Sequence, residues 1–170
     1  MVTADQLILV GAPAAGKTTV GELVAQRRGL PFTDTDALLA AQLGLSLPEA
    51  WANLPEQQLT AAEAELCVAA VQRPGVIALG SRAVAEPAVR AALAGRPVGW
   101  LRVSSTQLTR RLGMASLGME TLAAIRAQLD ALLAERSPWY EEVATFRLDT
   151  DRMEPAAVAD LVEQAWEGKA

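Results

Sequence analysis

The sequence predicts an α/β fold in which a parallel β-sheet is covered by helices. Two observations lead to this prediction. Short apolar runs alternate along the chain with longer segments of helical periodicity, and glycine or proline separates most of them. The first apolar run also passes directly into a glycine-rich loop and then into a helix, an order typical of parallel α/β proteins.

Five apolar runs predict five strands. They are short, and most carry no polar alternation, as expected for strands buried on both faces. The expected strands cover residues 6–10, 30–36, 76–79, 98–103 and 144–148. Because parallel strands need long crossover connections, we expect the intervening helices to pass over the faces of the sheet with right-handed crossovers.

Helices are expected where apolar residues recur at three- and four-residue spacing. The first begins at Gly16 and ends at Gly29, a residue type common at helix C-termini. The long central helix, about 56–72, is expected to turn four residues inward: Leu59, Ala62, Leu66 and Ala69. The other expected helices are 37–43, 87–93, 106–112, 120–136 and 155–166, with short helical turns within 45–55 and a mobile loop at 113–119.

Length and composition limit the number of domains and the classes of protein to which the chain can belong. The 170 residues suit one domain, 1–170, with a core from about 5 to 167. A net charge of −5 argues against a general nucleic-acid binder. One cysteine and no histidine exclude a disulfide framework and a histidine-liganded zinc site. No apolar stretch is long enough to span a membrane and the N-terminus lacks a positive region, so the expected location is the cytoplasm.

Residues Gly11–Thr18 form a phosphate-binding loop. They read Gly-Ala-Pro-Ala-Ala-Gly-Lys-Thr and fit the pattern G-x-x-x-x-G-K-[ST]. Backbone N–H groups of such a loop surround a phosphate, Lys17 reaches the β- and γ-phosphates, and the Thr18 hydroxyl binds Mg²⁺. The pattern therefore predicts an ATP site with Mg²⁺. The residues expected to bind ATP are Gly11, Ala12, Ala14, Ala15, Gly16, Lys17, Thr18 and Thr19.

Two carboxylates lie at the carboxyl end of the second expected strand. Ligands of open α/β sheets bind at the carboxyl ends of the strands, where Asp34 and Asp36 lie. Alternation along a strand would place both on the same side. Two carboxylates there suit two roles, one holding hydrated Mg²⁺ and the other accepting the proton of a substrate hydroxyl. The alternative is that Asp36 only caps a helix starting at Ala37.

Taken together, these features resemble the shikimate kinase family over nearly the whole chain, from about Leu7 to Trp166. The tail Glu135-Arg-Ser-Pro-Trp-Tyr140 points to this family among phosphate-loop proteins. The segments that carry the resemblance are Leu9–Gly21, Phe32–Asp36, Gly75–Gly80, Glu135–Tyr140 and Ala144–Thr150.

The resemblance implies a P-loop kinase fold with strand order 2-3-1-4-5. It also implies an acceptor-binding region at about 37–66 and a lid at about 112–120 over the ATP. The implied reaction is phosphoryl transfer from ATP to the 3-hydroxyl of shikimate by a monomer. Nothing implies a nucleic-acid or membrane partner.

The resemblance also implies roles for individual residues. Asp34 matches the acid near Mg²⁺, and Asp36 matches the acid that binds the substrate hydroxyl and is the candidate base, so the expected catalytic residues are Lys17 and Asp36.

Arg136 matches an arginine that binds the substrate carboxylate, and Gly80 matches the first glycine of a Gly-Gly-Gly turn near the substrate. Arg110 and Arg152 lie where the family packs arginine around adenine, to within one position. Trp51 falls where the family has an aromatic residue in the substrate pocket.

The chain departs from the family pattern in its acceptor half. A substrate-binding arginine of the family is replaced by Thr60, and the glycine turn reads Gly80-Ser81-Arg82. The lid also has no arginine, since none occurs between Arg111 and Arg126. The expected substrate-binding residues are Asp36, Gly80, Ser81, Arg82 and Arg136.

Three functions therefore remain open from the sequence. The first is an active shikimate kinase, in which Arg82 either reaches the space left at Thr60 or is simply an exposed turn residue. The second is a catalytically impaired, nucleotide-binding paralogue with a regulatory or partner-binding role. The third is a kinase of the same fold with a changed small-molecule acceptor.

Overall fold

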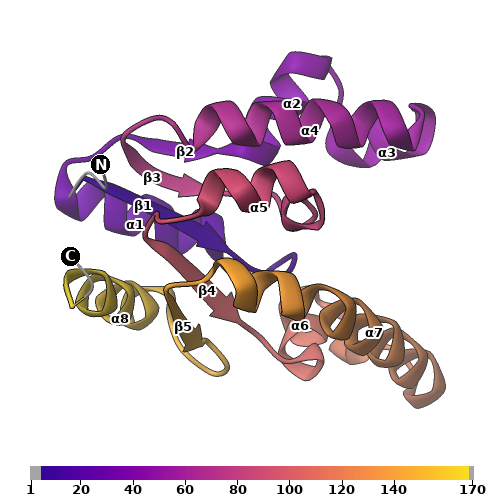
Figure 1. Cartoon of the computed structure of the whole chain (residues 1–170). Coiled ribbons are helices and arrows are strands. Elements are labelled where there is room, and N and C mark those ends of the chain that lie inside the picture. The colour runs from indigo at the N-terminus through magenta and orange to yellow at the C-terminus, as the bar shows by residue number, and fades with distance from the viewer. Residues whose placement is uncertain (1–4, 169–170) are drawn as a thin grey trace.

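A computed structural model, which describes residues 5–168, contains the expected five-stranded parallel sheet. The strand order is β2-β3-β1-β4-β5, which confirms the order implied by the family resemblance (Figure 1). The strands are β1 (Gln6–Val10), β2 (Phe32–Asp34), β3 (Gly75–Ala78), β4 (Val98–Arg102) and β5 (Phe146–Asp149).

Strand β1 occupies the centre of the sheet and carries the phosphate loop at its carboxyl end. Ile8 is in register with Ile77 of β3 on one side and with Val98 of β4 on the other. All five residues of β1 are buried. A strand with neighbours on both edges and helices on both faces has no solvated side, which explains why its sequence is almost entirely apolar.

The two faces of the sheet support two separate hydrophobic cores. Leu7 and Leu9 of β1 belong to the core beneath α1 (Lys17–Arg28) and α8 (Pro155–Glu167). Their neighbours in β1 point the other way, into the core formed with three helices (Figure 1). These helices are α4 (Glu56–Ala70), α5 (Pro87–Leu93) and α7 (Met119–Val143).

The remaining elements lie around the carboxyl edge of the sheet and in the connections. They are α2 (Thr35–Leu43), α3 (Leu47–Asn53), α6 (Ser105–Arg111) and two 3₁₀ turns, η1 (Ala83–Ala85) and η2 (Met114–Ser116). Helix α3 begins with a capping box, in which Ser46 and Glu49 satisfy each other's backbone N–H groups. The loop expected at 113–119 is thus partly ordered, because it contains η2 and the first residue of α7.

The inward face of α4 differs from the expected one. Leu59 is buried as predicted, but the next buried positions are Glu63, Cys67 and Ala70, and Ala69 is exposed. From Leu59, a step of four residues to Glu63 fits the 3.6-residue helical period as well as the expected step of three residues to Ala62. The prediction was therefore wrong about which face packs inward, and this error hid a buried carboxylate.

Helix α7 extends further than the sequence predicted. It continues through Pro138 to Val143, although proline removes one backbone donor and usually ends a helix. Packing stabilises the extension: Tyr140 is 1% exposed, and its ring centroid lies 5.6 Å from that of Trp100. Between residues 5 and 168, no helix has the length and hydropathy to cross a membrane.

Candidate active site

The phosphate loop connects β1 to α1 in the conformation that its glycines allow. Gly16 has a φ of 97°, and Ala14 also adopts a positive φ of 59°. No side chain caps the N-terminus of α1. The N–H groups of its first turn are therefore available to an anion, and the helix dipole adds positive potential there.

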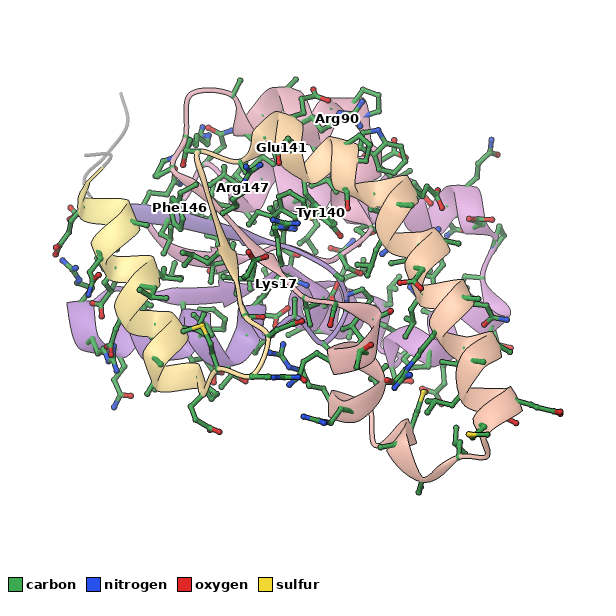
Figure 2. The ribbon with its side chains drawn as sticks, turned by 90° about the horizontal axis from the view of Figure 1, so that it is seen from below. Lys17, Arg90, Tyr140, Glu141, Phe146 and Arg147 are labelled. Atoms are coloured by element: carbon green, nitrogen blue, oxygen red, sulfur yellow. The ribbon has the colours of Figure 1, made fainter. Side chains whose placement is uncertain are left out.

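Lys17 lies inside this loop, near the middle of the molecule (Figure 2). Its Nζ donates hydrogen bonds to the carbonyl oxygens of Gly11, at 2.8 Å, and Ala12, at 2.9 Å. Burial lowers the pKa of Lys17 to about 8, against the opposing effect of Asp36 and Asp34. The lysine is thus a cation close to both carboxylates, and its charge is sensitive to mildly alkaline pH.

Asp34 lies against Thr18, the last residue of the phosphate loop, so that two side-chain oxygen atoms come together. Thr18 Oγ1 donates a hydrogen bond of 2.6 Å to Asp34 Oδ2. The described residues contain no group of three or more His, Cys, Asp or Glu side chains that could hold a metal. A magnesium ion bound to nucleotide phosphates needs only one or two protein ligands besides water, so Thr18 and Asp34 fit Mg²⁺.

The two aspartates do not alternate along a strand, which corrects the sequence prediction. Strand β2 ends at Asp34, and Asp36 lies in the first turn of α2. Asp34 Oδ1 accepts hydrogen bonds from the backbone N–H groups of Asp36, at 2.9 Å, and Ala37, at 3.3 Å. The helix cap is therefore Asp34, and the Asp36 carboxylate is not used for capping.

Asp36 faces the turn after β3. A Cβ atom at Gly80 would lie 2.5 Å from Asp36 Oδ1, so this carboxylate needs a glycine beside it. Burial, and then the charge of Asp34, raise the pKa of Asp36, while Lys17 opposes the shift. A carboxylate with a raised pKa is a better proton acceptor at neutral pH than an ordinary aspartate.

Glu63 is a second buried carboxylate, which the sequence reasoning missed. It is 6% exposed, and its Oε1 would lie 2.6 Å from a Cβ atom at Gly80. Burial and the charge of Asp36 raise the pKa of Glu63 to about 7, and Arg82 and Arg136 oppose the shift. The signal in the sequence was its position four residues after Leu59, on the buried face of α4.

We expect Glu63→Gln to stabilise the protein at pH 8. A carboxyl group whose pKa is higher in the folded state destabilises that state once it ionises, so wild-type stability falls as pH rises from 4.5 to about 7. The glutamine variant should gain about 1–3 kcal/mol of unfolding free energy at pH 8 and little at pH 4. Denaturant unfolding at both pH values measures this, and an equal change at both would contradict it.

The Gly80–Arg82 turn is hydrogen-bonded to both α2 and α7. The N–H of Gly80 donates to Thr35 Oγ1 at 2.8 Å. Arg136 Nη1 donates to Ser81 Oγ at 3.2 Å, and the Tyr140 hydroxyl donates to the Ser81 carbonyl at 2.7 Å. In Figure 2 Tyr140 lies on the part of α7 that packs on the body of the molecule. This helix therefore brings Arg136 to the same turn as Asp36 and Glu63.

Arg111, the neighbour of Arg110, contacts the phosphate loop, and the predicted contact of Arg110 with adenine stays a prediction. Arg111 Nη1 donates to the carbonyl oxygens of Ala14 and Ala15, both at 3.1 Å, and its Nη2 donates to the Thr150 carbonyl at 2.9 Å. Arg110 is exposed and lines no part of the cleft described here. The two arginines are adjacent in the sequence, and only the packing of α6 decides which one turns inward.

The phosphate loop and the residues facing it surround one cleft of about 550 Å³. Most of the predicted loop residues, both aspartates and Ser81 line it. Of the predicted substrate-binding residues, Gly80, Arg82 and Arg136 do not line it, and Arg136 is connected to it by its hydrogen bond to Ser81. Arg152 lies exposed in the turn after β5, so its predicted contact with adenine stays a prediction. The lining residues are Pro13, Ala14, Ala15, Gly16, Lys17, Thr18, Thr19, Val20, Asp34, Asp36, Ala78, Leu79, Ser81, Arg111, Thr150, Met153, Pro155 and Val158.

Comparison with solved structures gives the same fold. The chain superposes on a shikimate kinase from Acinetobacter baumannii, solved in complex with shikimate, with a TM-score of 0.84 and 26% identity over 97% of this chain and 94% of that one. A gluconokinase from Sinorhizobium meliloti has a TM-score of 0.63 at 18% identity, covering 100% of this chain and 95% of that one. The second likeness reflects the fold alone.

Comparison of sequences is more specific. The chain is 40% identical over 161 residues to the shikimate kinase of Mycobacterium avium (strain 104), covering 94% of this chain and 92% of the relative. It is 41% identical over 160 residues to the shikimate kinase of Frankia casuarinae, covering 94% of this chain and 71% of the relative. A family model described as shikimate kinase matches residues 13–167. The chain therefore belongs to the shikimate kinase family.

Proposed function

We propose that this protein transfers the γ-phosphoryl group of ATP to the 3-hydroxyl of shikimate. The observation that supports this most is that Lys17, in the phosphate loop, and Asp36, beside the Gly80 turn, line the same cleft. One residue belongs to the nucleotide half and the other to the acceptor half. Family membership supports shikimate as the acceptor, because relatives across nearly the whole chain are shikimate kinases.

In this proposal the chain contributes orientation and charge. The loop N–H groups and Lys17 hold the phosphates, and Asp36 accepts a hydrogen bond from the acceptor hydroxyl. As the acceptor oxygen bonds to the γ-phosphorus, the bond from that phosphorus to the β,γ-bridging oxygen breaks. ADP leaves with that electron pair, and the hydroxyl proton passes to Asp36.

Thr18 and Asp34 are the residues that would hold Mg²⁺. When bound, this ion offsets negative charge on the phosphates. Since Asp34 also caps α2, the metal ligand Asp34 and the proton acceptor Asp36 are positioned by a single helix terminus. This arrangement supports a fixed distance between the metal side of the cleft and Asp36.

A coupled assay of ADP release, with and without shikimate and with Mg²⁺ present, tests the proposal. We expect ADP release to depend on shikimate, with shikimate 3-phosphate as the product detected by ³¹P NMR. ATP binding without turnover on any acceptor would instead identify an impaired nucleotide-binding paralogue. Turnover only with another hydroxylated acid or polyol would identify a kinase with a changed acceptor.

The monomeric state and the cytoplasmic location stay predictions from the sequence.

A further inference from the structure

We propose that Arg82, stacked on Trp51, binds the carboxylate of the acceptor in place of its exposed partner Glu56. The inference rests on the proposed function and adds to it a residue that gives specificity for an acidic acceptor. Position 60, where the family resemblance implies a carboxylate-binding arginine, carries threonine in this chain. A neutral hydroxyl cannot supply the paired, charge-assisted hydrogen bonds that a guanidinium gives to a carboxylate.

Arg82 is positioned by two residues from different segments. Its Cζ lies 3.8 Å from the centroid of the Trp51 ring, in α3, so the guanidinium stacks on the aromatic face. Its Nη2 donates a hydrogen bond of 2.9 Å to Glu56 Oε1, at the start of α4. Stacking uses one face of the guanidinium plane and leaves the edge of the plane available for hydrogen bonding.

The guanidinium has donors to spare. Arginine has five N–H donors, and within the part of the chain described here the side chain of Arg82 makes a hydrogen bond only through Nη2. The Arg82 side chain is 39% exposed and that of Glu56 is 78% exposed. Such an exposed ion pair contributes little stability, so a ligand carboxylate can share or replace Glu56.

Arg82 directly follows a residue of the cleft wall, although it does not itself line the cleft. The residue before it, Ser81, lines the cleft and accepts a hydrogen bond from Arg136. Asp36 and Glu63 approach Gly80, one position earlier. A small molecule whose hydroxyl contacts Asp36 therefore meets a turn that ends in Arg82 and contacts Arg136.

The backbone permits arginine at position 82, the third position of the turn, where the family resemblance implies glycine. At Arg82, φ is −89° and ψ is −21°, in the right-handed helical region that every L-residue adopts. Gly80 is different, because a Cβ atom there would collide with the Asp36 and Glu63 carboxylates. The turn therefore requires glycine at its first position but accepts an arginine at its third.

The test combines a change in the protein with a change in the ligand. Shikimate and its methyl ester are compared on the parent chain, on Arg82→Ala and on Arg82→Lys. We expect Arg82→Ala to raise the KM for shikimate by ~10- to 100-fold and to leave the KM for ATP unchanged. The preference for shikimate over its ester should fall by the same factor, because the ester has already lost the charge that Arg82 recognises. Arg82→Lys should keep part of the preference.

Arg147→Ala is the matched control. Arg147 lies in β5, and its Nη1 donates to Glu141 Oε1 at 2.6 Å (Figure 2). Its side chain is 57% exposed, and it does not line the cleft. This variant also removes one arginine from an exposed ion pair, so it should change neither the KM for shikimate nor the preference over the ester.

Glu56→Ala separates carboxylate binding from a purely structural role of Arg82. If Arg82 binds the acceptor, this variant removes the carboxylate that competes for Nη2 while Trp51 still holds the guanidinium, so the KM for shikimate should stay equal or fall. If Arg82 only ties α4 to the turn, Glu56→Ala should raise that KM as Arg82→Ala does. That result would overturn the inference, and so would an Arg82→Ala variant that weakens shikimate and ester equally.

The outcomes distinguish this inference from the proposed function. Shikimate-dependent ADP release by the parent chain with unchanged selectivity in Arg82→Ala overturns only the role of Arg82. If the parent uses another hydroxylated acid, the assignment of shikimate falls, and the same comparison with that acid and its ester decides the role of Arg82. If the parent binds ATP but neither binds nor phosphorylates any acidic acceptor, both proposals are wrong.

Discussion

Asp36→Asn is expected to lower kcat for shikimate phosphorylation by ~10²- to 10⁴-fold, the range for loss of a general base. The asparagine keeps the shape of the side chain and can still contact the acceptor hydroxyl, but it cannot take its proton. The backbone cap of α2 should survive, because Asp34 provides it. ATP affinity should therefore change little, and steady-state kinetics with titration of ATP binding measure both quantities.

The pH profile provides an independent check on Asp36. Burial and the Asp34 charge raise its pKa, so the acid limb of kcat/KM should lie above the usual aspartate range. In Asp36→Asn that limb should disappear. Asp149→Asn is the control, since Asp149 is 76% exposed and pairs only with Arg102 in the described chain. A loss of less than about tenfold in Asp36→Asn would mean that another group accepts the proton.

Lys17→Met is expected to reduce kcat/KM for ATP by about 10³-fold or more, because it removes the cation of the phosphate loop. Wild-type kcat/KM for ATP should also fall as pH rises above about 8, the pKa that burial gives Lys17 in the free protein. At saturating ATP the decline should begin at higher pH, since bound phosphates favour the charged amine. Rate measurements between pH 7 and 10 test this.

The same variant should be more stable than the wild type at pH 7. Because the pKa of Lys17 is lower in the folded state, the buried charge destabilises that state below about pH 8, and the penalty disappears as pH rises toward 10.5. We expect Lys17→Met to gain about 1–3 kcal/mol of unfolding free energy at pH 7 and less at pH 10. Loss of activity through misfolding would instead lower stability at both pH values.

The two predictions concern neighbouring charges in one cleft, and their combination is informative. The charges of Lys17 and Asp36 each shift the pKa of the other. Their effects on rate should therefore be less than additive, as for groups that act as a unit. The double variant should retain more activity than the product of the two single losses predicts.

The sequence by itself determined the strands, the phosphate loop and most of the helix positions. These features depend on residues that are close together in the chain. A glycine-rich loop between an apolar run and a helix has the same meaning in any context, because its phosphate donors are its own backbone N–H groups. Family-specific segments at both ends of the chain similarly sufficed to imply the strand order.

Only the tertiary structure decided which side chains meet at the acceptor end. Glu63 was hidden because two inward faces of α4 fit its apolar pattern almost equally well, and the packing of the helix on the sheet selected one. Arg111 and Arg110 differ only in the direction that α6 gives them. Arg82 acquires its partners from α3 and α4, 26 or more positions earlier in the chain. Such contacts depend on the relative placement of distant elements, which local periodicity does not encode.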